Sequence, residues 1–600
     1  MYKQSINLVW VSALVFAGLF TSSCAETKAP KVKKYSEFTE MPDPARDSVA
    51  NWTNTAKGLQ SSFVSIDTKF DKSVEPLIAT PQMTERIIGW QGERLSAQLI
   101  VWANSDVKEI EYEISDFKSS NNTLPASIAD LRFVRYVMTD EFAGGCGYRS
   151  PEDFAQSLAP DMLDNINVMD LEANTVRPIW VSVAIPEGTP AGVYTSTIEI
   201  SAQNESTKKF KLEVEVQDAV LPAPSTWTYH LDLWQHPSAV ARAQNLELWS
   251  DEHFEAMKPL MKMLADAGQK VITTTLNKEP WNNQCYDAYA DMITWTKNED
   301  GTMSYDYTIF DRWVTFMMDL GIKGMINCYS VVPWNNELHY LDAKTGEYVT
   351  LQANPGTEVF DETWHSFFVD FKKHLSEKGW LEITNVAMDE RSPAEMEKTI
   401  AMLQKEAPEL GISYADNQKS YKKYPFVKDI SIEAGASYDL QDIIDRREKG
   451  LITTYYVCCS DAFPNMFTFS ESTESVYAGL YALAGGFDGF LRWAYNSWVE
   501  NPLTDSRFRT WPAGDTYIVY PDARSSIRFE RLVEGIQDVE KIKVLRTQLE
   551  QSSNPNAKAL LEELNTTVAA FKTIHPTNYV DMVNNAKALL ARITNELAKN

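Results

Sequence analysis

The chain has 600 residues, of which 44% are hydrophobic and 12% aromatic, and its formal net charge at pH 7 is −27. This length and apolar content predict a multidomain protein with packed cores and exclude an intrinsically disordered chain. The negative charge argues against nucleic acid as a partner, because a polyanion would be repelled unless basic side chains gathered in one place.

The first 23 residues are predicted to be a lipoprotein signal peptide. Lys3 precedes an apolar stretch from Leu8 to Phe20, and small residues lead into Cys24. A basic residue before a short apolar run is typical of an export signal. We therefore expect lipidation of Cys24, a tether over residues 24–47, and an exported bacterial lipoprotein. It would be held at the membrane by its lipid alone and face the periplasm or the cell surface. An ordinary secretory signal and an uncleaved anchor are the alternatives, although the run is short for a membrane span.

The cysteine and histidine patterns indicate neither a disulfide framework nor a metal site. Five cysteines follow Cys24, none with Cys-x-x-Cys spacing: Cys146, Cys285, Cys328, Cys458 and Cys459. An odd number cannot all pair within the chain, and a chain this long does not need a disulfide, so buried thiols are expected. The seven histidines include no ligand spacing such as His-Glu-x-x-His. We expect no catalytic metal and no cofactor.

Residues 48–222 are predicted to form an antiparallel β-sandwich. Lys209 to Val216 alternates strictly between apolar and charged residues, as a half-buried strand does. Two further strand patterns, Ile179 to Ile185 and Tyr194 to Ile200, flank a segment with two prolines and two glycines, which predicts a meander. Such a domain either binds carbohydrate or serves as a spacer. We favour a spacer, because no row of exposed aromatic residues is evident.

After Leu221-Pro222-Ala223-Pro224, strands and helices alternate, which predicts a (β/α)8 barrel over residues 223–545. The predicted strands are Trp227–Trp234, Val271–Leu276, Met325–Val332, Thr384–Met388, Ile412–Ala415, Asp429–Glu433, Ile452–Cys459 and Gly489–Trp493. The predicted helices are Phe254–Ala267, Asp311–Leu320, Glu362–Lys378 and Ala394–Gln404. From about Asp538 onward, leucines at helical spacing predict a C-terminal α-helical appendage, with residues 546–600 as a separate domain.

The barrel prediction directs attention to the residues that follow each strand, because active sites in this fold lie at the carboxyl ends of the strands. Polar and aromatic side chains stand at these points: Trp234, Tyr329, Trp334, Asp389, Glu390, Tyr414, Asp416, Asn417, Asp461 and the segment Trp493–Trp498. Together they predict a carbohydrate site, since planar rings stack on the C–H faces of sugars.

The most informative pair is Asp389-Glu390, which follows the apolar run Thr384–Met388. Retaining glycosidases usually place two carboxyl groups ~5 Å apart on opposite sides of the scissile bond. Neighbours in sequence instead favour a substrate-assisted reaction, in which the 2-acetamido oxygen of the sugar attacks its own anomeric carbon. In this interpretation Glu390 is the general acid/base, with a pKa raised by its pocket, and Asp389 orients and polarises the acetamido group.

Several motifs together resemble glycoside hydrolase family 123. They are the Asp389-Glu390 pair, Gly489–Trp498, Trp511–Asp515, and the segment from Ser526-Ile527-Arg528 to Asp538. The resemblance covers roughly residues 50–545 and implies an exo-acting retaining β-N-acetylgalactosaminidase that forms an oxazoline intermediate. Its partners would be glycans that end in β-linked N-acetylgalactosamine. The family's catalytic pair falls on Asp389 and Glu390.

We add substrate-binding candidates from chemistry rather than from the family: Trp234, Tyr414, Asp416, Asn417, Trp493, Tyr495 and Trp498. Tyr414 is proposed because a phenol can hydrogen-bond an acetamido oxygen, and Trp493, Tyr495 and Trp498 because planar rings can stack on sugar rings. The segment from Ser526 to Asp538 is interpreted as structural. Two alternatives stay open: a β-N-acetylglucosaminidase or another acetamido-sugar glycosidase, and a non-catalytic surface lipoprotein that binds glycans.

Overall fold

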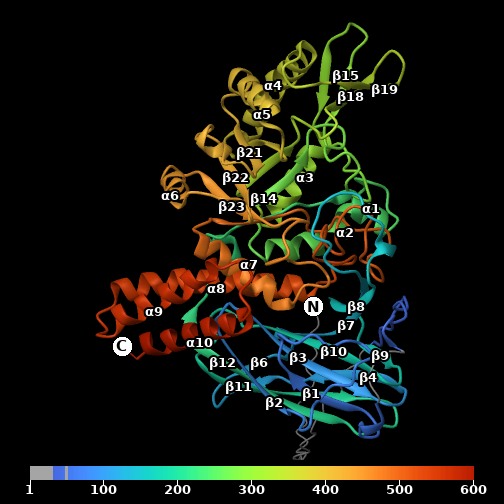
Figure 1. Ribbon diagram of the computed structural model, residues 1–600, viewed down its shortest axis with the longest axis vertical. Coiled ribbons are helices and arrows are strands. Elements are labelled where there is room, and N and C mark those ends of the chain that lie inside the picture. The colour runs from blue at the N-terminus through green and yellow to red at the C-terminus, as the bar shows by residue number, and fades with distance from the viewer. Residues whose placement is uncertain (1–31, 47–51, 600) are drawn as a thin grey trace, which may run out of the picture.

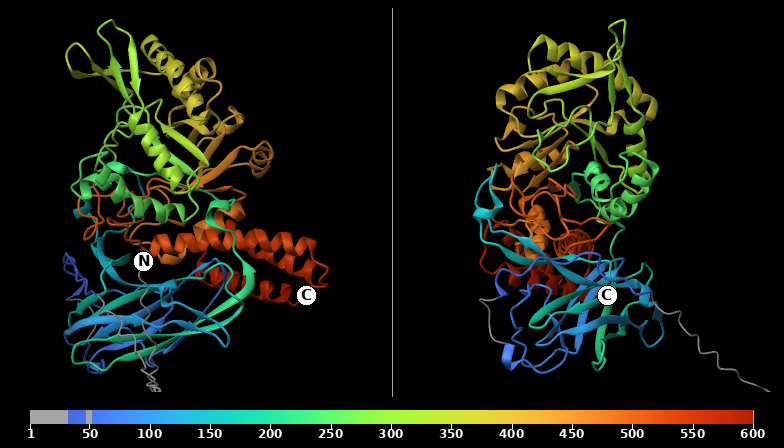
Figure 2. Two further views of the ribbon diagram at one scale, coloured as in Figure 1. Left: turned by 180° about the vertical axis from the view of Figure 1, so that it is seen from behind. Right: turned by 90° about the vertical axis from the view of Figure 1, so that its right-hand side faces the viewer.

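The computed structural model of the chain describes residues 32–46 and 52–599. The predicted signal peptide and the lipidation site at Cys24 lie outside the described residues. Within the described part, no helix is both long enough and apolar enough to span a bilayer. The molecule is elongated, with a β-sandwich at one end, a barrel at the other and a bundle of C-terminal helices beside the junction (Figures 1 and 2).

The N-terminal domain consists of two packed sheets, which confirms the predicted sandwich. One sheet has the strand order β1 (Gln60–Val64), β3 (Arg94–Ala103), β10 (Thr175–Ala184), β7 (Ala129–Thr139) and β8 (Ser157–Leu163). The other has the order β2 (Thr84–Gln91), β12 (Lys208–Val220), β11 (Gly192–Ser201), β4 (Val107–Ile114) and β9 (Val168–Leu171), with the short strands β5 (Phe117–Lys118) and β6 (Thr123–Leu124) attached. The pairing is antiparallel except between β2 and β12.

The alternation in β12 has the predicted consequence for packing. Phe210, Leu212 and Val214 are buried in the core between the sheets, while the intervening Lys211 and Glu213 pair with each other on the outer face. β12 lies antiparallel to β11. A two-residue period therefore buries one face of the strand and leaves the other in water.

The described part of the predicted tether is bound to the sandwich. Glu40 is buried and accepts hydrogen bonds from Arg135 and Arg177, and Lys72 lies 2.9 Å from its second carboxylate oxygen. Nearby, Lys33 pairs with Glu109. Because a buried carboxylate surrounded by three cations is costly to expose, this segment is a docked strap rather than a free linker.

The central domain contains all eight predicted barrel strands, although β21 begins one residue earlier than predicted and several end sooner. Their order is β13 (His230–Leu233), β24 (Gly489–Arg492), β23 (Ile452–Tyr456), β22 (Asp429–Glu433), β21 (Gly411–Asp416), β20 (Thr384–Met388), β17 (Met325–Tyr329) and β14 (Val271–Thr275), and all pairs are parallel. Between β13 and β14 a single parallel bridge, Leu231 to Gln269, nearly closes the barrel.

Helices cover the outside of the barrel between most strands. They are α1 (Pro237–Ala243), α2 (Asp251–Ala265), α3 (Thr308–Asp319), α4 (Glu358–Lys378), α5 (Pro393–Glu406), α6 (Leu440–Glu448) and α7 (Ser472–Gly485). The connection from β21 to β22 contains only the short 3-10 helix η7 (Ser420–Lys422).

A small sheet that the sequence did not predict projects from the end of the barrel distant from the sandwich (Figure 1). Its strand order is β16 (Met303–Asp306), β15 (Thr294–Lys297), β18 (Glu337–Asp342) and β19 (Glu347–Gln352). Both hairpins lie in the connections that flank β17. Each strand is short and mostly half-exposed, so the hydrophobic pattern that marks a buried strand is weak.

The C-terminal bundle consists of α8 (Ile527–Gln551), α9 (Ala557–Ala569) and α10 (Tyr579–Leu597). Helix α8 starts eleven residues before the helical pattern recognised in the sequence, and it runs across the boundary predicted at residue 545. Its first half is buried on all sides, so it lacks the one-sided apolar pattern by which surface helices are recognised.

The segment from Ser526 to Asp538 connects the domains, as expected for a structural motif. The Ser526 hydroxyl accepts a hydrogen bond from the Phe529 backbone and caps α8. Arg528 forms a buried ion pair with Asp161 of the sandwich at 2.8 Å. Further along α8, Lys541 pairs with Glu93 at 2.7 Å. Arg528 also donates to the Met466 carbonyl of the barrel domain at 2.6 Å, so helix α8 is fixed to both domains at once.

Candidate active site

The carboxylate pair lies where β20 ends at the mouth of the barrel. All five residues of β20 are buried, and Asp389 and Glu390 follow directly as partly buried side chains. Two residues later Ser392 caps α5, in a reciprocal arrangement with Glu395. The short connection between a buried strand and a capped helix fixes the backbone of both acidic residues.

Asp389 is held by two donors. The indole N–H of Trp334, in the connection after β17, donates to Asp389 Oδ2 at 2.8 Å. The backbone N–H of Glu390 donates to Asp389 Oδ1 at 2.9 Å. Burial raises the pKa of Asp389, while these two hydrogen bonds act against that rise by stabilising the ionised form.

Glu390 has the electrostatic environment of a proton donor. Burial is the largest cause, followed by the negative charges of Asp389, Glu433, Asp416 and Asp461, and together they raise the pKa of Glu390 to about 7. The Tyr456 hydroxyl, at the end of β23, donates a hydrogen bond to Glu390 Oε1. A carboxyl group with this pKa can give and take a proton near neutral pH.

The pair opens into a cavity of about 370 Å³ at the centre of the barrel mouth. Its walls come from the ends of several barrel strands and from longer connections, one of them in the sandwich: Trp234, Gln284, Trp334, Asp389, Glu390, Ala415, Tyr456, Val457, Cys458, Cys459, Leu491, Trp493, Trp511, Asp515, Cys146 and Gly147. We call this cavity the central pocket. It combines a carboxyl pair with four indole rings, as a sugar site requires.

Three of the four indole rings of the central pocket pack against other aromatic rings. Trp493 and Trp511 meet edge to face, with centroids 5.4 Å apart and an interplanar angle of 86°. Trp234 packs on Tyr329 and Trp281 at centroid distances of 4.5 and 5.3 Å. Indole rings that line a cavity suit the C–H faces of a sugar.

One wall of the central pocket belongs to the sandwich. The connection between β7 and β8 reaches up beside the barrel (Figure 1, cyan), and its Cys146 forms a disulfide with Cys459, with Cα atoms 5.1 Å apart. The expectation that all thiols stay free is therefore wrong for this pair. Cys285, Cys328 and Cys458 are free, and the first two are buried, as expected.

A second cavity, of about 240 Å³, lies on the other side of Glu390. It shares Glu390 and Ala415 with the central pocket, but not Asp389. We call it the side pocket. It lies between the start of α5 and the loop after β21, and its other lining residues are Arg391, Pro393, Met396, Tyr414, Asp416, Asn417, Gln418, Lys419, Ser420, Lys422, Lys423 and Tyr424.

The predicted binding residues therefore fall into three groups. Trp234 and Trp493 line the central pocket, whereas Tyr414, Asp416 and Asn417 line the side pocket. The Tyr414 hydroxyl accepts a hydrogen bond from Ser420 at 2.9 Å, away from Asp389. Residues in either pocket can contact a sugar. Tyr414 and Asp389, however, were both expected to bind the acetamido group, and they line different pockets.

The third group, Tyr495 and Trp498, lies in the core, and the prediction that these rings stack on sugar is corrected. Tyr495 is fully buried and donates to the Leu260 carbonyl at 2.9 Å. Trp498 is 1% exposed and donates to the Val519 carbonyl at 2.7 Å. After β24 the chain is irregular, so the side chains of this aromatic segment do not alternate regularly between pocket and core.

Several residues of the central pocket were not among the proposed site residues. Trp334 and Tyr456 contact the carboxyl pair. Trp334 was named among the side chains that follow the strands but was given no role, and Tyr456 could have been found because it ends β23. Cys146 and Gly147 come from another domain, and no local pattern connects them with the barrel. Trp511 enters from the long connection before α8.

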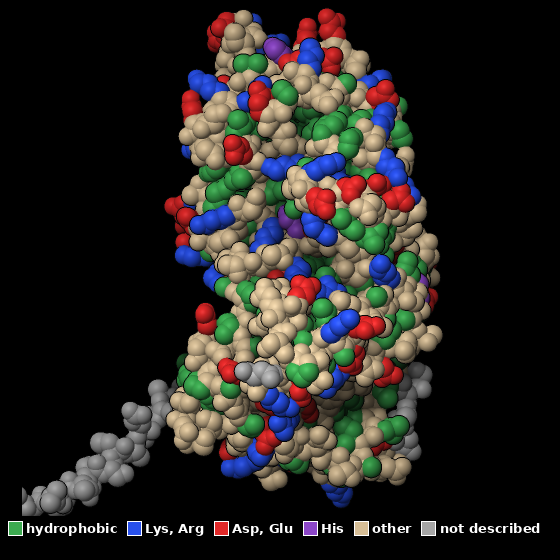
Figure 3. Space-filling view, turned by 90° about the vertical axis from the view of Figure 1, so that its left-hand side faces the viewer, with side chains coloured by type: hydrophobic (Ala, Val, Ile, Leu, Met, Phe, Trp, Pro, Cys, Tyr) green, Lys and Arg blue, Asp and Glu red, His purple; other side chains and the backbone are tan. Residues whose placement is uncertain are grey.

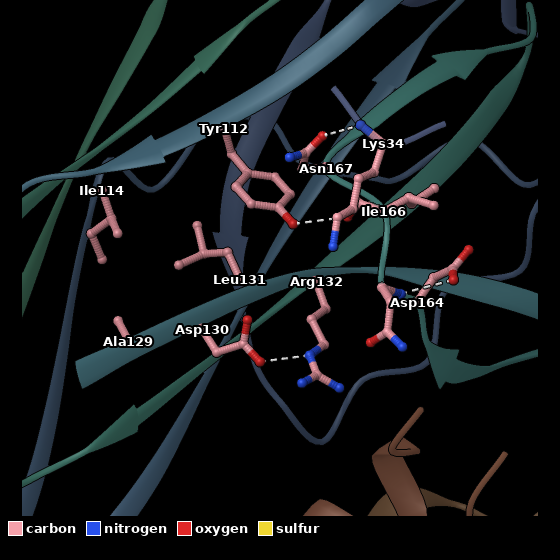
Figure 4. A pocket seen from close by; sticks show the side chains of 11 residues that line it. Lys34, Tyr112, Ile114, Ala129, Asp130, Leu131, Arg132, Asp164, Ile166 and Asn167 are labelled. Atoms are coloured by element: carbon pink, nitrogen blue, oxygen red, sulfur yellow. Dashed lines mark hydrogen bonds and ion pairs between the residues drawn. The ribbon is translucent and has the colours of Figure 1, made fainter. Parts of the chain in front are cut away.

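The sandwich has a surface cavity of about 380 Å³, shown in Figure 4, without comparable chemistry. Its single aromatic ring belongs to Tyr112, whose hydroxyl donates to the Ile166 carbonyl and whose ring packs on Phe133 in the core. Asp130 and Arg132 neutralise each other at 2.6 Å. Nothing in this cavity resembles the indole walls of the central pocket.

Charge does not single out another site on the face shown in Figure 3, where acidic and basic side chains are interspersed. Among the described residues, Glu433, Cys458 and Asp461 bring possible metal-ligand atoms within 4.8 Å of one another. Burial and the adjacent Asp461, however, raise the pKa of the Cys458 thiol to about 12, and only a thiolate binds metal well. The absence of a catalytic metal and of a cofactor stays a prediction.

Comparison with solved structures identifies a similar protein of known family. It is a family 123 glycoside hydrolase from Clostridium perfringens, described in terms of glycolipid glycan hydrolysis. It shares 27% sequence identity with this chain at a TM-score of 0.80, over 90% of this chain and 98% of its own.

Two other solved glycosidases are far less similar. A Bacteroides ovatus xyloglucanase of family 5 is 10% identical at a TM-score of 0.28, over 76% of this chain and 98% of its own. A maltogenic α-amylase from Thermotoga neapolitana is 10% identical at a TM-score of 0.29, over 52% of this chain and 76% of its own. At these scores neither structure shows a fold in common with the whole chain. No curated protein sequence matches the chain.

Two family models match the chain. The model described as the glycoside hydrolase 123 catalytic domain matches residues 234–545, and the glycoside hydrolase 123 N-terminal domain matches residues 63–202. The first match contains the carboxyl pair and the barrel strands that line the central pocket, and the second lies in the sandwich. The chain belongs to glycoside hydrolase family 123 and is a glycosidase.

Proposed function

We propose that this enzyme is an exo-acting retaining β-N-acetylgalactosaminidase that removes terminal β-linked N-acetylgalactosamine by substrate-assisted catalysis. The observation that carries the proposal is the contrast between two adjacent carboxyl groups. The pKa of Glu390 is raised to about 7, which suits a proton donor. The Asp389 carboxylate accepts two hydrogen bonds that favour its charged form, which suits stabilisation of a cation.

In the proposed first step, Glu390 protonates the glycosidic oxygen while the bond to the anomeric carbon breaks. The carbonyl oxygen of the 2-acetamido group attacks the anomeric carbon, and the positive charge passes to the oxazolinium ring. Asp389 accepts a hydrogen bond from the N–H of the acetamido group and stabilises the positive charge. The Tyr456 hydroxyl holds the Glu390 carboxylate that the proton transfer creates.

In the second step, the Glu390 carboxylate takes a proton from a water molecule. That water attacks the anomeric carbon, opens the oxazolinium ring and restores the acetamido group and the β configuration. Two successive inversions give retention, although no enzyme nucleophile is involved. The reaction needs one carboxyl that changes its protonation state and one that stays charged, and the two adjacent residues suit these roles.

The natural substrate is proposed to be the glycan of a glycolipid, by likeness to the Clostridium perfringens enzyme, whose structure is described in those terms. The alternative is that this enzyme prefers N-acetylglucosamine. That sugar differs from N-acetylgalactosamine only in the orientation of the hydroxyl group at C4. A purely glycan-binding role is disfavoured, because a binding protein has no use for a buried carboxyl group whose pKa is close to 7.

The direct test is hydrolysis of the aryl 2-acetamido-2-deoxy-β-galactoside and of its gluco isomer by the wild type, Glu390→Gln and Asp389→Asn. We expect the galacto substrate to be preferred, and both variants to lose most of the activity while keeping the wild-type unfolding temperature. Inhibition by a thiazoline analogue of the oxazoline would support the intermediate. Preference for the gluco isomer would change the sugar alone, whereas an undiminished Asp389→Asn enzyme would contradict the substrate-assisted mechanism.

A further inference from the structure

Three sulfur atoms meet at one wall of the central pocket. Cys146 of the sandwich is bonded to Cys459, and the residue before Cys459 in the chain, Cys458, carries a free thiol. The three Sγ atoms all lie within 4.8 Å of one another, and all three residues line the pocket. A free thiol this close to a disulfide is what thiol–disulfide exchange requires, because the attacking sulfur must reach a bonded one.

The segment that carries Cys146 has room to move toward Cys458. Cys146 is exposed and lies between Gly145 and Gly147. A Cβ added to either glycine would meet no atom within 4 Å, so the backbone on both sides is loosely packed. Bonded sulfur atoms are ~2.05 Å apart, so the two sulfurs must approach each other by at most ~3 Å.

The ends of this loop are held near the barrel by contacts other than the disulfide. The backbone N–H of Arg149 donates to the Arg509 carbonyl at 2.5 Å. On the other side of the loop, the ring of Phe142 stacks on that of Phe467, with centroids 5.9 Å apart. These contacts keep the loop within reach of the barrel, whereas the position of its middle, at Cys146, depends on the disulfide.

Cys458 is held mostly as a thiol, which makes exchange slow at neutral pH. Burial is the largest cause, followed by the charge of Asp461 and a smaller contribution from Asp515, and they raise the pKa of this thiol to about 12. Glu433 at the end of β22 is a further acidic neighbour, and Arg492 at the end of β24, paired with Asp515, is the opposing cation. Only a thiolate attacks a disulfide, so the rate should rise about tenfold for each pH unit.

We propose that Cys458 is a second disulfide partner for Cys146, and that exchange between the two pairings gives this wall of the central pocket two covalent forms. The Cys458 thiolate attacks Cys146 Sγ, and a bond forms between these two sulfurs as the bond from Cys146 to Cys459 breaks. The electron pair of the broken bond leaves with Cys459 Sγ, which takes up the proton that Cys458 lost. The exchange needs no external oxidant or reductant, and it does not depend on which sugar the enzyme cleaves.

The test locates the free thiol by labelling. The wild type is incubated at pH 7 and at pH 9, acid stops the exchange, and N-ethylmaleimide then labels the free thiols of the unfolded protein without any reductant. Fragmentation of the cross-linked peptide in a mass spectrometer shows whether Cys458 or Cys459 carries the label. The buried thiols of Cys285 and Cys328 report on folding, since they stay unlabelled for as long as the incubated protein is folded.

We expect label on Cys458 alone at the start, and then a growing share on Cys459 that appears about a hundredfold faster at pH 9 than at pH 7. The matched control is Cys458→Ser, in which no label should reach Cys459 at either pH. Label confined to Cys458 after long incubation at pH 9 would overturn the proposal. Label on Cys459 in the control would overturn it too, because hydroxide rather than Cys458 would then have opened the bond.

Two variants hold the two covalent forms apart. Cys458→Ser keeps the native bond, whereas Cys459→Ser removes the native partner, so that Cys146 and Cys458 should be recovered as a cross-linked pair. For the aryl 2-acetamido-2-deoxy-β-galactoside we expect a severalfold higher KM in Cys459→Ser, because the wall is then attached one residue away from its native position.

Alkylation of both Cys146 and Cys458 in Cys459→Ser would overturn the proposal, because the second pairing would then not form. Equal KM values in the two variants would overturn the claim that the exchange changes the pocket. The labelling does not rely on activity, so its failure leaves the proposed function standing, and a wild type that cleaves no substrate leaves the exchange standing.

Discussion

Tyr456 and Glu390 meet across the barrel mouth, with the phenol hydroxyl at the end of β23 donating to the carboxyl group that follows β20. Because the hydroxyl stabilises the ionised carboxyl, Tyr456→Phe should raise the pKa of Glu390, make it a weaker acid and slow the first step, in which Glu390 protonates the glycosidic oxygen. A hydrogen bond to a charged group contributes ~1.5–3 kcal/mol, so we expect kcat to fall by about tenfold or more. The pH profile of the variant should shift upward on its basic side, and an unshifted profile would show that the contact is not made in solution.

The activity should depend on pH in a bell shape. The general acid works only when protonated, and the pKa of Glu390 is about 7, so kcat/KM should be lost as the pH rises through 7. The stabilising carboxylate works only when ionised, and the pKa of Asp389 is raised from its ordinary value of 3.8, so activity should be lost on the acidic side at a pH above that value. Measurement of kcat/KM between pH 4 and 9 checks both limbs, and full activity retained well above pH 7 would exclude Glu390 as the acid.

Trp334→Phe should move the acidic limb of this profile. The indole N–H stabilises the charged form of Asp389 through a hydrogen bond of 2.8 Å. Phenylalanine keeps an aromatic ring but has no donor, so the pKa of Asp389 should rise and the acidic limb should shift to higher pH, while the basic limb stays in place. Trp511→Phe is the matched control, because Trp511 lines the same pocket but its indole donates to the Gln284 carbonyl. Equal shifts in both variants would contradict the specific role of Trp334.

The sequence predicted the barrel better than the pocket, for a physical reason. Each barrel strand is a short buried run bounded by loops, so local hydrophobicity reveals it, and the end of β20 leads directly to Asp389 and Glu390. After β24 the backbone is irregular, and the sequence does not show which of its side chains face the cavity. The prediction that Tyr495 and Trp498 contact sugar is therefore wrong, because both are buried in the core. The contribution of Cys146 could not be found at all, because it is joined to its partner across 313 residues and comes from another domain.

The disulfide predicts a connection between stability and substrate affinity. Cys146 and Gly147 form a wall of the central pocket and are fixed there by the bond to Cys459. Cys146→Ser should lower the free energy of unfolding by ~2–5 kcal/mol and raise KM severalfold, because the loop from the sandwich is no longer held against the barrel. Treatment of the wild type with a reductant should have the same effect. Cys458→Ser is the control, since this neighbouring thiol is free, and an equal rise of KM in that variant would refute the role of the bond.

Gly535→Ala should destabilise the protein, which is the opposite of the usual effect in a helix. Gly535 lies within α8 where it packs against α7, and an added Cβ would come within 2.7 Å of the Val476 carbonyl oxygen. Replacement of a helical glycine by alanine ordinarily stabilises by ~1 kcal/mol, whereas forcing a methyl group into a packed contact costs ~1–3 kcal/mol. We therefore expect a lower unfolding temperature in calorimetry. Gly145→Ala, where no atom lies within 4 Å of the added Cβ, is the control and should change little. A stabilised Gly535→Ala protein would mean that α7 and α8 are less closely packed than described.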